Sequence, residues 1–189
     1  MTGLPEWLAS TVASDAAGGD GALSAEIHAL SPERTVAGPA LVAQTSLNDN
    51  LVMKEVPAAV TGPGTVLVVA GAAASRTAVL GDLVARELLA AGVIAVVTDG
   101  PIRDSQAVAD LGLAVWSKGT TPVASAKNGP GRVGGTVEIA GVTVTDGDLV
   151  VADADGVVVW PAADVETLLA KAEAKQRADE ERLAALTRR

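Results

Sequence analysis

The sequence predicts an α/β fold, and the central part of the chain carries that prediction. Residues 65–70 and 93–98 are continuous apolar runs, which is typical of strands buried on both faces. Between these runs, apolar residues recur at three- and four-residue steps, as on one face of a helix, at Leu80, Leu83, Val84, Leu88 and Ala91. A strand, a helix and a strand within about 35 residues form a βαβ unit, which favours parallel strands joined by a right-handed crossover.

The segment before this unit is predicted to contain short helices, strand-like stretches and turns. Helical signals lie at 7–8, 12–15 and 51–60, strand-like signals at 25–30 and 37–43, and turn signals at 18–19, 48–50 and 63–64. His28 lies in the first strand-like stretch and is expected to be structural.

The segment after the unit is predicted to add strands and a C-terminal helix. The expected elements are a short helix at 104–111, strands at 113–117, 148–152 and 156–160, a hairpin formed by 136–139 and 142–144, and a helix at 162–189. Asp153 and Asp155 most simply make a tight turn between the last two strands. The apolar face of the last helix fails after Ala172, so its polar end is either a solvated helix end or an arm that reaches a neighbouring subunit. We expect one domain over residues 1–189.

A glycine pattern near the middle of the chain does not indicate a nucleotide site. Gly129, Gly131 and Gly134 match G-x-G-x-x-G. A strand rather than a helix is predicted to follow, so this is not a dinucleotide fingerprint, and we expect a flexible loop.

The composition excludes several kinds of chemistry. The 189 residues include no cysteine, one histidine, three tryptophans and no phenylalanine or tyrosine. Disulfides, thiolate nucleophiles and cysteine zinc sites are therefore excluded, and the aromatic platform of a single-strand nucleic-acid module is absent. The remaining metal candidate is a hard cation held by oxygen ligands, such as Mg²⁺ or Mn²⁺.

The charge balance and apolar pattern also bear on partners and location. The formal net charge is −9, which does not favour nucleic-acid binding. Residues 1–10 lack the basic and apolar regions of a secretory signal, and the chain has no run of 18 uncharged apolar residues. We therefore expect a cytoplasmic protein with neither a nucleic-acid nor a membrane partner.

Three short segments are candidates for the functional site. Gly81, Asp82, Leu83 and Val84 open the clearest helix, where unpaired backbone N–H groups attract a carboxylate or phosphate. Arg103 and Asp104 follow the next strand and should lie beside that helix start; Arg103 suits a carboxylate or enolate, and Asp104 a hard cation. Lys118 follows the third strand at the same edge, where it could meet an anion or form a Schiff base with a keto group. A structural cap, a salt bridge or a surface lysine would also explain these residues.

The ordered set of motifs resembles the aldolase family that includes 4-hydroxy-4-methyl-2-oxoglutarate aldolase and the regulator of ribonuclease E activity A. The family's aldolases carry D-x20-R-D, and here 20 residues separate Asp82 from Arg103-Asp104. Supporting motifs lie at 36–40, 49–51, 63–64, 81–83, 99–100, 115–119, 147–149 and 152–157. The resemblance extends over roughly residues 14–181.

The resemblance implies an α-β-β-α sandwich with a central mixed sheet, a swivelling fold like that of phosphohistidine domains, assembled as a homotrimer or a dimer of trimers. It implies a class II aldolase that cleaves a 4-hydroxy-2-oxo acid to pyruvate and also decarboxylates oxaloacetate. By the same resemblance, the amides of residues 81–84 hold the pyruvyl carboxylate, and Arg103 stabilises the keto or enolate oxygen. The resemblance also implies that Asp104 ligates Mg²⁺, Mn²⁺ or another divalent cation and that Asp82 positions a water. Glu180 or Glu181 of a neighbouring subunit would complete the metal's outer shell.

Two alternatives remain beside this expectation. One is a non-catalytic protein that binds and regulates a ribonuclease, against which the retained Asp82 argues, since regulatory members need not keep it. The other is a Schiff-base aldolase that uses Lys118 and does not depend on a metal.

Overall fold

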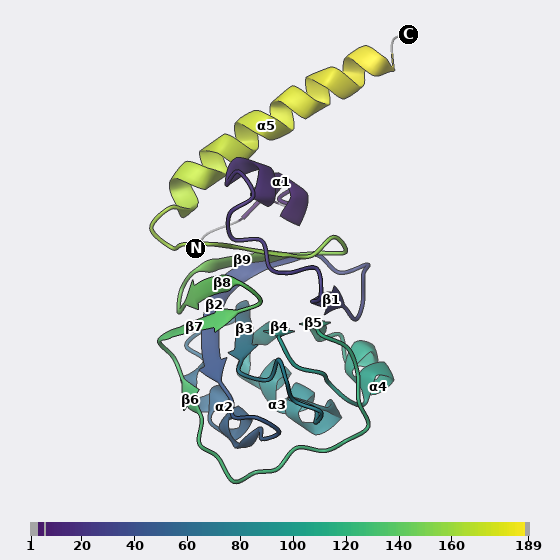
Figure 1. The fold of residues 1–189 in the computed structure, drawn as a ribbon. Coiled ribbons are helices and arrows are strands. Elements are labelled where there is room, and N and C mark those ends of the chain that lie inside the picture. The colour runs from purple at the N-terminus through teal and green to yellow at the C-terminus, as the bar shows by residue number, and fades with distance from the viewer. Residues whose placement is uncertain (1–3, 6, 188–189) are drawn as a thin grey trace.

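The computed structural model describes residues 4–5 and 7–187, and its ribbon is shown in Figure 1. Its helices are α1 (Ser10–Ala16), the 3-10 helix η1 (Leu51–Lys54), α2 (Val56–Ala59), α3 (Asp82–Ala91), α4 (Ser105–Asp110) and α5 (Val165–Leu186). Its strands are β1 (His28–Ala29), β2 (Val36–Gln44), β3 (Thr65–Ala70), β4 (Val93–Thr98), β5 (Ala114–Ser117), β6 (Arg132–Val133), β7 (Thr136–Ile139), β8 (Val142–Thr145), β9 (Leu149–Ala152) and β10 (Val157–Trp160).

A curled mixed sheet forms the centre of the molecule. Its strand order is β1-β5-β4-β3-β2-β9-β10, and β6 pairs with β2 at the side. Strands β2 to β5 are parallel, whereas β1, β6, β9 and β10 pair antiparallel with their neighbours. The parallel pair β3–β4 enclosing α3 confirms the predicted βαβ unit. Gly92 ends α3 with φ 101°, a left-handed conformation that suits glycine.

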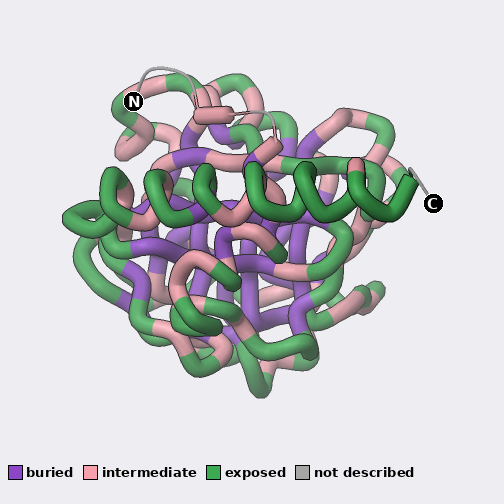
Figure 2. The backbone as a smooth tube through the Cα atoms, turned by 90° about the horizontal axis from the view of Figure 1, so that it is seen from above, coloured by how far each residue is buried: buried purple, intermediate pink, exposed green. Residues whose placement is uncertain are grey.

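Three apolar clusters separate four layers, which gives the expected α-β-β-α sandwich. Alternate residues of β3 point to opposite faces: Val66 and Val68 pack towards β9, β10 and the β7–β8 hairpin, and Leu67 and Val69 pack against α2, α3 and α4. A third cluster joins the outer face of β9 and β10 to α1 and α5. Figure 1 shows α1 and α5 on one side of the strands and α2, α3 and α4 on the other. In Figure 2 the buried backbone lies beneath a largely exposed α5.

Buried hydrogen bonds fix α1 to the sheet. The Asp153 carboxylate, in the turn between β9 and β10, accepts from the Ser10 backbone N–H at 2.7 Å, the Ser10 hydroxyl at 2.6 Å and the Asp155 backbone N–H at 3.0 Å. The Trp160 indole donates to the Ala13 carbonyl at 3.1 Å. The predicted turn is therefore also the anchor of the N-terminal helix.

The structure corrects some expected elements. The segment 129–134 is not a loop throughout, because Arg132 and Val133 form β6 and pair with Gln44 and Ala43. The strand expected at 25–30 is limited to β1, where His28 is exposed at the sheet edge. No helix forms at Trp7-Leu8, and α5 begins at Val165 rather than at residue 162. Among the described residues, no helix combines the length and apolar character needed to cross a membrane.

Candidate active site

The candidate site lies at the carboxyl ends of β3, β4 and β5, where three loops meet. Backbone hydrogen bonds join the loop after β3 to the loop after β4: Val79 N–H donates to the Pro101 carbonyl at 2.9 Å, and Arg103 N–H donates to the Leu80 carbonyl at 3.0 Å. The loop after β5 adds a bond from Ile102 N–H to the Gly119 carbonyl at 3.0 Å. Ligand sites in open α/β sheets commonly occupy this edge.

The start of α3, Arg103 and Asp104 come together as the sequence predicts. The Arg103 Nε lies 3.3 Å from the Asp104 Oδ2, and the Asp82 backbone N–H points to the same oxygen at 3.4 Å. A Cβ on Gly81 would lie 2.5 Å from that oxygen and 2.9 Å from the Arg103 Cγ and Nε. Glycine at position 81 therefore lets the two charged side chains lie directly against the helix start.

The Asp104 carboxylate is held loosely. Both contacts are longer than the usual range of about 2.7–3.2 Å. The side chains of Arg103 and Asp104 are 39% and 40% exposed. They line a surface hollow of about 590 Å³ with Ser105, Gln106, Ala107, Thr120, Thr121 and Pro122. The negative carboxylate is attracted by the positive end of α3, but enough of it faces solvent to bind a cation.

The backbone of Asp104 has φ 53° and ψ 37°, in the left-handed region. Few residues other than glycine adopt this conformation, although Asp and Asn tolerate it better than most. The next residue begins α4, so the left-handed turn sets the direction in which the chain leaves the site. Asp104 thus meets a backbone requirement in addition to placing its side chain at the candidate site.

Asp99 is a residue of this edge to which the sequence analysis assigned no role. Its buried carboxylate accepts from the backbone N–H of Ala72 at 2.8 Å and of Gly71 at 3.1 Å, and so fastens the loop after β3 to the end of β4. Burial raises the pKa of the Asp99 carboxyl, while these donors and the Lys118 charge act in the opposite direction. An acidic residue directly after a buried strand was the available signal.

Asn50 and Lys127 form a second group; Asn50 lies in one of the supporting motifs but had no predicted role, and Lys127 lies in none of them. The Asn50 Nδ2 donates to the Val79 carbonyl at 2.8 Å, and its Oδ1 accepts from the Lys127 Nζ at 3.1 Å. Asn50 therefore connects Lys127 to the chain that leads into α3. Little in the sequence indicates this contact, because Asn50 and Lys127 are 77 positions apart.

In the described part of the chain, Lys118 and the C-terminal glutamates form no ion pair with Arg103 or Asp104. The Lys118 ammonium pairs with Glu26 at 3.0 Å. Glu180 and Glu181 are exposed on α5, which Figure 1 places on the opposite side of the sheet from α3 and α4. Within one chain these glutamates do not join the site, so a role there would need a second copy of the chain.

One chain offers few protein ligands for a metal ion. In the part of the chain that the structure describes, no three or more His, Asp or Glu side chains gather so that they could hold one. Mg²⁺ commonly keeps several waters and binds through only one or two carboxylates. The exposed Asp104 oxygen at the helix start fits that mode of binding, although it does not enclose an ion.

Comparison with known proteins identifies the family. The model of the RraA-like family, described as Aldolase/RraA, matches residues 10–159, and the chain belongs to this family. A protein of Halalkalibacterium halodurans with the provisional name 4-hydroxy-4-methyl-2-oxoglutarate aldolase is 37% identical over 179 residues, which cover 94% of this chain and 84% of that protein.

Two solved structures show that the whole fold is shared. Streptomyces coelicolor RraAS2, described as an unusual member of the RNase ES inhibitor RraA family, superposes with a TM-score of 0.79 at 30% identity, over 96% of this chain and 92% of that one. The RNA-processing inhibitor RraA from Thermus thermophilis gives a TM-score of 0.72 at 29% identity, over 82% and 93% of the two chains. The resemblance stated from the motifs, and the fold it implied, are confirmed.

Proposed function

We propose that this protein is a divalent-metal-dependent lyase that cleaves a 4-hydroxy-2-oxo acid, such as 4-hydroxy-4-methyl-2-oxoglutarate, and releases pyruvate. The observation that carries the proposal is the contact of Arg103 and Asp104 with the start of α3, at Gly81 and Asp82. This arrangement offers backbone donors, a guanidinium and a partly exposed carboxylate within one small volume. The curated relatives with aldolase names support the same activity.

A divalent cation bound by Asp104, such as Mg²⁺ or Mn²⁺, would supply Lewis acidity at the substrate's keto oxygen. The backbone N–H groups of residues 82–84 face the end of the helix and would hold the carboxylate next to that keto group. To bind there, the substrate displaces the Asp104 oxygen from the Asp82 N–H, a contact that at 3.4 Å is already weak.

Arg103 would stabilise the negative charge that develops as the bond between C3 and C4 breaks. Its guanidinium donates to the oxygen on C2, which becomes an enolate oxygen in the transition state. Asp82, in the first turn of α3, would hold the water that carries protons to and from substrate and enolate. Because loss of CO₂ from oxaloacetate gives the same pyruvate enolate, these residues would also support oxaloacetate decarboxylation.

A neighbouring copy would complete the site. We propose a homotrimer or a dimer of trimers in which α5 of one copy brings Glu180 or Glu181 near Asp104 of the next. The support is that α5 is 22 residues long and mostly exposed beyond Ala172. The proposed partners are therefore the 2-oxo acid and further copies of the chain.

Pyruvate release tests the activity. We expect release from 4-hydroxy-4-methyl-2-oxoglutarate and from oxaloacetate in Mg²⁺, and none in excess EDTA. Arg103→Ala should reduce kcat/KM by about 10²–10³, because it removes one donor to the developing oxyanion. Pyruvate release that persists in EDTA, together with a covalent adduct of enzyme and pyruvate that borohydride traps, would point to a Schiff base on Lys118 instead. No release from folded, metal-loaded protein would contradict the proposal.

A second candidate function is regulation of a ribonuclease without catalysis. The structural similarity to the RraA inhibitors favours it, since TM-scores of 0.72 and 0.79 indicate the same overall fold. A ribonuclease assay distinguishes the two functions. A regulator should lower ribonuclease activity equally well as the wild type and as the Arg103→Ala variant. An enzyme without this role should leave the ribonuclease unaffected.

A further inference from the structure

Lys127 is a lysine whose ammonium is held by an uncharged side chain and forms no ion pair in the described part of the chain, although the Asp49 carboxylate is near enough for the Lys127 charge to help lower the Asp49 pKa. Its Nζ lies 3.1 Å from the amide oxygen of Asn50, which is uncharged. Asn50 is only 6% exposed, and its amide nitrogen is fixed by the Val79 carbonyl at 2.8 Å. By contrast, Lys118 pairs with Glu26, and Lys175 pairs with Asp15 and Asp179. A positioned ammonium beside a neutral partner can bind an anionic ligand.

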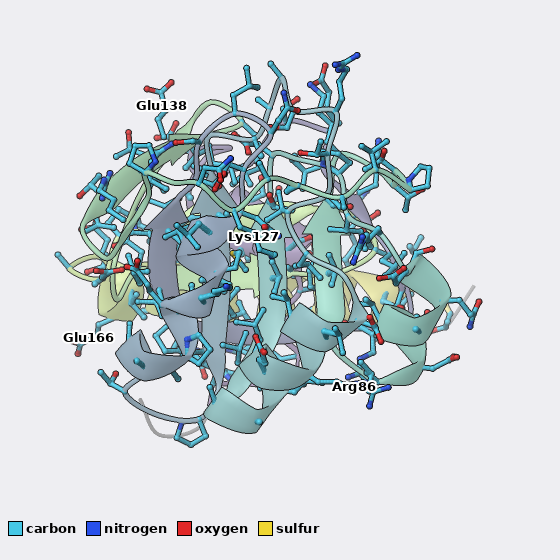
Figure 3. The ribbon with its side chains drawn as sticks, turned by 90° about the horizontal axis from the view of Figure 1, so that it is seen from below. Arg86, Lys127, Glu138 and Glu166 are labelled. Atoms are coloured by element: carbon cyan, nitrogen blue, oxygen red, sulfur yellow. The ribbon has the colours of Figure 1, made fainter. Side chains whose placement is uncertain are left out.

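This ammonium borders a hollow that runs along α3. The hollow has a volume of about 720 Å³ and is lined by Lys54, Pro57, Leu83, Val84, Glu87, Ala90, Ala91 and Lys127. Leu83 and Val84 belong to the first turn of α3, whose N–H groups face the proposed substrate carboxylate. In Figure 3, Lys127 is near the middle of this side of the molecule, whereas Glu138 and Glu166 are at its edge.

The hollow has an apolar, a positively charged and a negatively charged part. Pro57, Leu83 and Val84 offer an apolar surface, and Leu83 is 69% exposed, so it is open to a ligand. Lys54 and Lys127 supply positive charge, and Glu87, one helical turn after Leu83, supplies negative charge. A carboxylate in this hollow is therefore attracted to the lysines and repelled from the Glu87 part of α3.

We propose that Lys127 binds the second carboxylate of a dicarboxylic 2-oxo acid and thereby selects such substrates over monocarboxylic ones. The inference rests on the proposed function, in which the α3 amides and Arg103 hold the pyruvyl end. The chain from C4 onward then lies over Leu83 and Val84, and the second carboxylate reaches Lys127. Asn50 is a positioning residue that holds the ammonium where the carboxylate meets it.

Substrate preference tests this role. We compare kcat/KM for 4-hydroxy-4-methyl-2-oxoglutarate with kcat/KM for 4-hydroxy-2-oxopentanoate, which lacks the second carboxylate. Lys127→Met should lower the ratio of the two values about 10- to 100-fold, the usual effect of losing a hydrogen bond between charged groups. Lys127→Arg should restore most of the ratio. Arg86→Met removes an equal charge from α3 outside the hollow and should leave the ratio unchanged.

Calorimetry separates failure of this inference from failure of the proposed function. We titrate metal-loaded protein with 2-oxoglutarate and with 2-oxopentanoate, which differ in the second carboxylate and need no turnover. If the wild type cleaves neither hydroxy acid, the proposed function fails, but tighter 2-oxoglutarate binding that Lys127→Met abolishes still supports the role of Lys127. A wild type without a dicarboxylate preference, or a Lys127→Met variant that keeps it, overturns the inference.

Discussion

Asp104 and Asp153 both follow strands of the central sheet, but their carboxylates are held in opposite ways. Asp153 is only 7% exposed, and its carboxylate accepts three hydrogen bonds of 2.6–3.0 Å. The Asp104 side chain is 40% exposed, and its contacts are 3.3 and 3.4 Å long. A carboxylate whose oxygens are fully satisfied stabilises the fold, whereas a loosely held one beside a helix start remains able to bind a ligand.

The same substitution at both positions tests this comparison most directly. Asp104→Asn keeps the side-chain shape and tolerates the left-handed backbone but removes the charge that would bind a cation. We expect pyruvate release to fall by about 10²–10³ with little change in Tm. Asp153→Asn places an amide NH₂ against the Ser10 donors and should cost roughly 1–3 kcal/mol of unfolding free energy. Its specific activity should survive, and equal loss of activity in both variants would contradict the distinction.

A smaller effect is expected from Gly81→Ala, which tests whether close approach to the helix start matters. Gly81 has φ −141°, so alanine fits the backbone, but its Cβ would lie 2.5 Å from the Asp104 Oδ2. Arg103 and Asp104 must then move, and we expect kcat/KM to fall by up to about 100-fold with the fold intact.

Gly92→Ala, at the other end of α3, is the matched control. Its φ of 101° disfavours alanine, so we expect a loss of about 1 kcal/mol in stability and unchanged kcat/KM. If kcat/KM falls equally in both glycine variants, the loss comes from a general disturbance of α3 and not from crowding at its first turn.

The smallest expected effect is a pH-dependent change in stability at Asp49, whose carboxylate, like that of Asp153, accepts several hydrogen bonds. The backbone N–H groups of Asn128 and Leu51 lower the pKa of Asp49 from its ordinary value of 3.8, and the Lys127 charge adds to the shift. Folding therefore favours the charged form. The resulting stability is present above pH 3.8 and is lost as the pH falls through the lowered pKa.

Urea unfolding of wild type and Asp49→Asn across this range measures the effect. The variant should be less stable than wild type at neutral pH, and the difference should narrow in acid as wild-type Asp49 takes up its proton. A difference that stays constant down to about pH 3 would show that charge at Asp49 does not contribute.

Local patterns predicted much of the fold. The bounds of β3 and β4 agree with the apolar runs at 65–70 and 93–98, because strands buried on both faces leave a clear signal. The β7–β8 hairpin, the β9–β10 pair and α3 also form where the sequence predicts them. The patterns failed where pairing is distant: β6 is two residues long, and its partner strand β2 lies about 90 residues away in the chain.

The candidate site was predicted where parallel strands bring loops together. Residues 81–84 and Arg103-Asp104 follow neighbouring strands, so the topology required them to meet. Asn50 and Lys127 could not be found in this way, because their contact depends on how the loop after β5 returns across the sheet. The same applies to Asp99, whose carboxylate acts on backbone groups that no sequence pattern reveals.

The left-handed backbone of Asp104 restricts how this position can change during evolution. Most side chains there would destabilise the folded protein by about 1–2 kcal/mol, so only Asp, Asn and Gly adopt this backbone conformation readily. Of these, only Asp carries a charge. If the protein catalyses the proposed reaction, a descendant that lost this activity but kept the fold would therefore most readily carry Asn or Gly at this position. Under the proposed function, the residue just before α4 would then distinguish active relatives from those that keep the fold for another use.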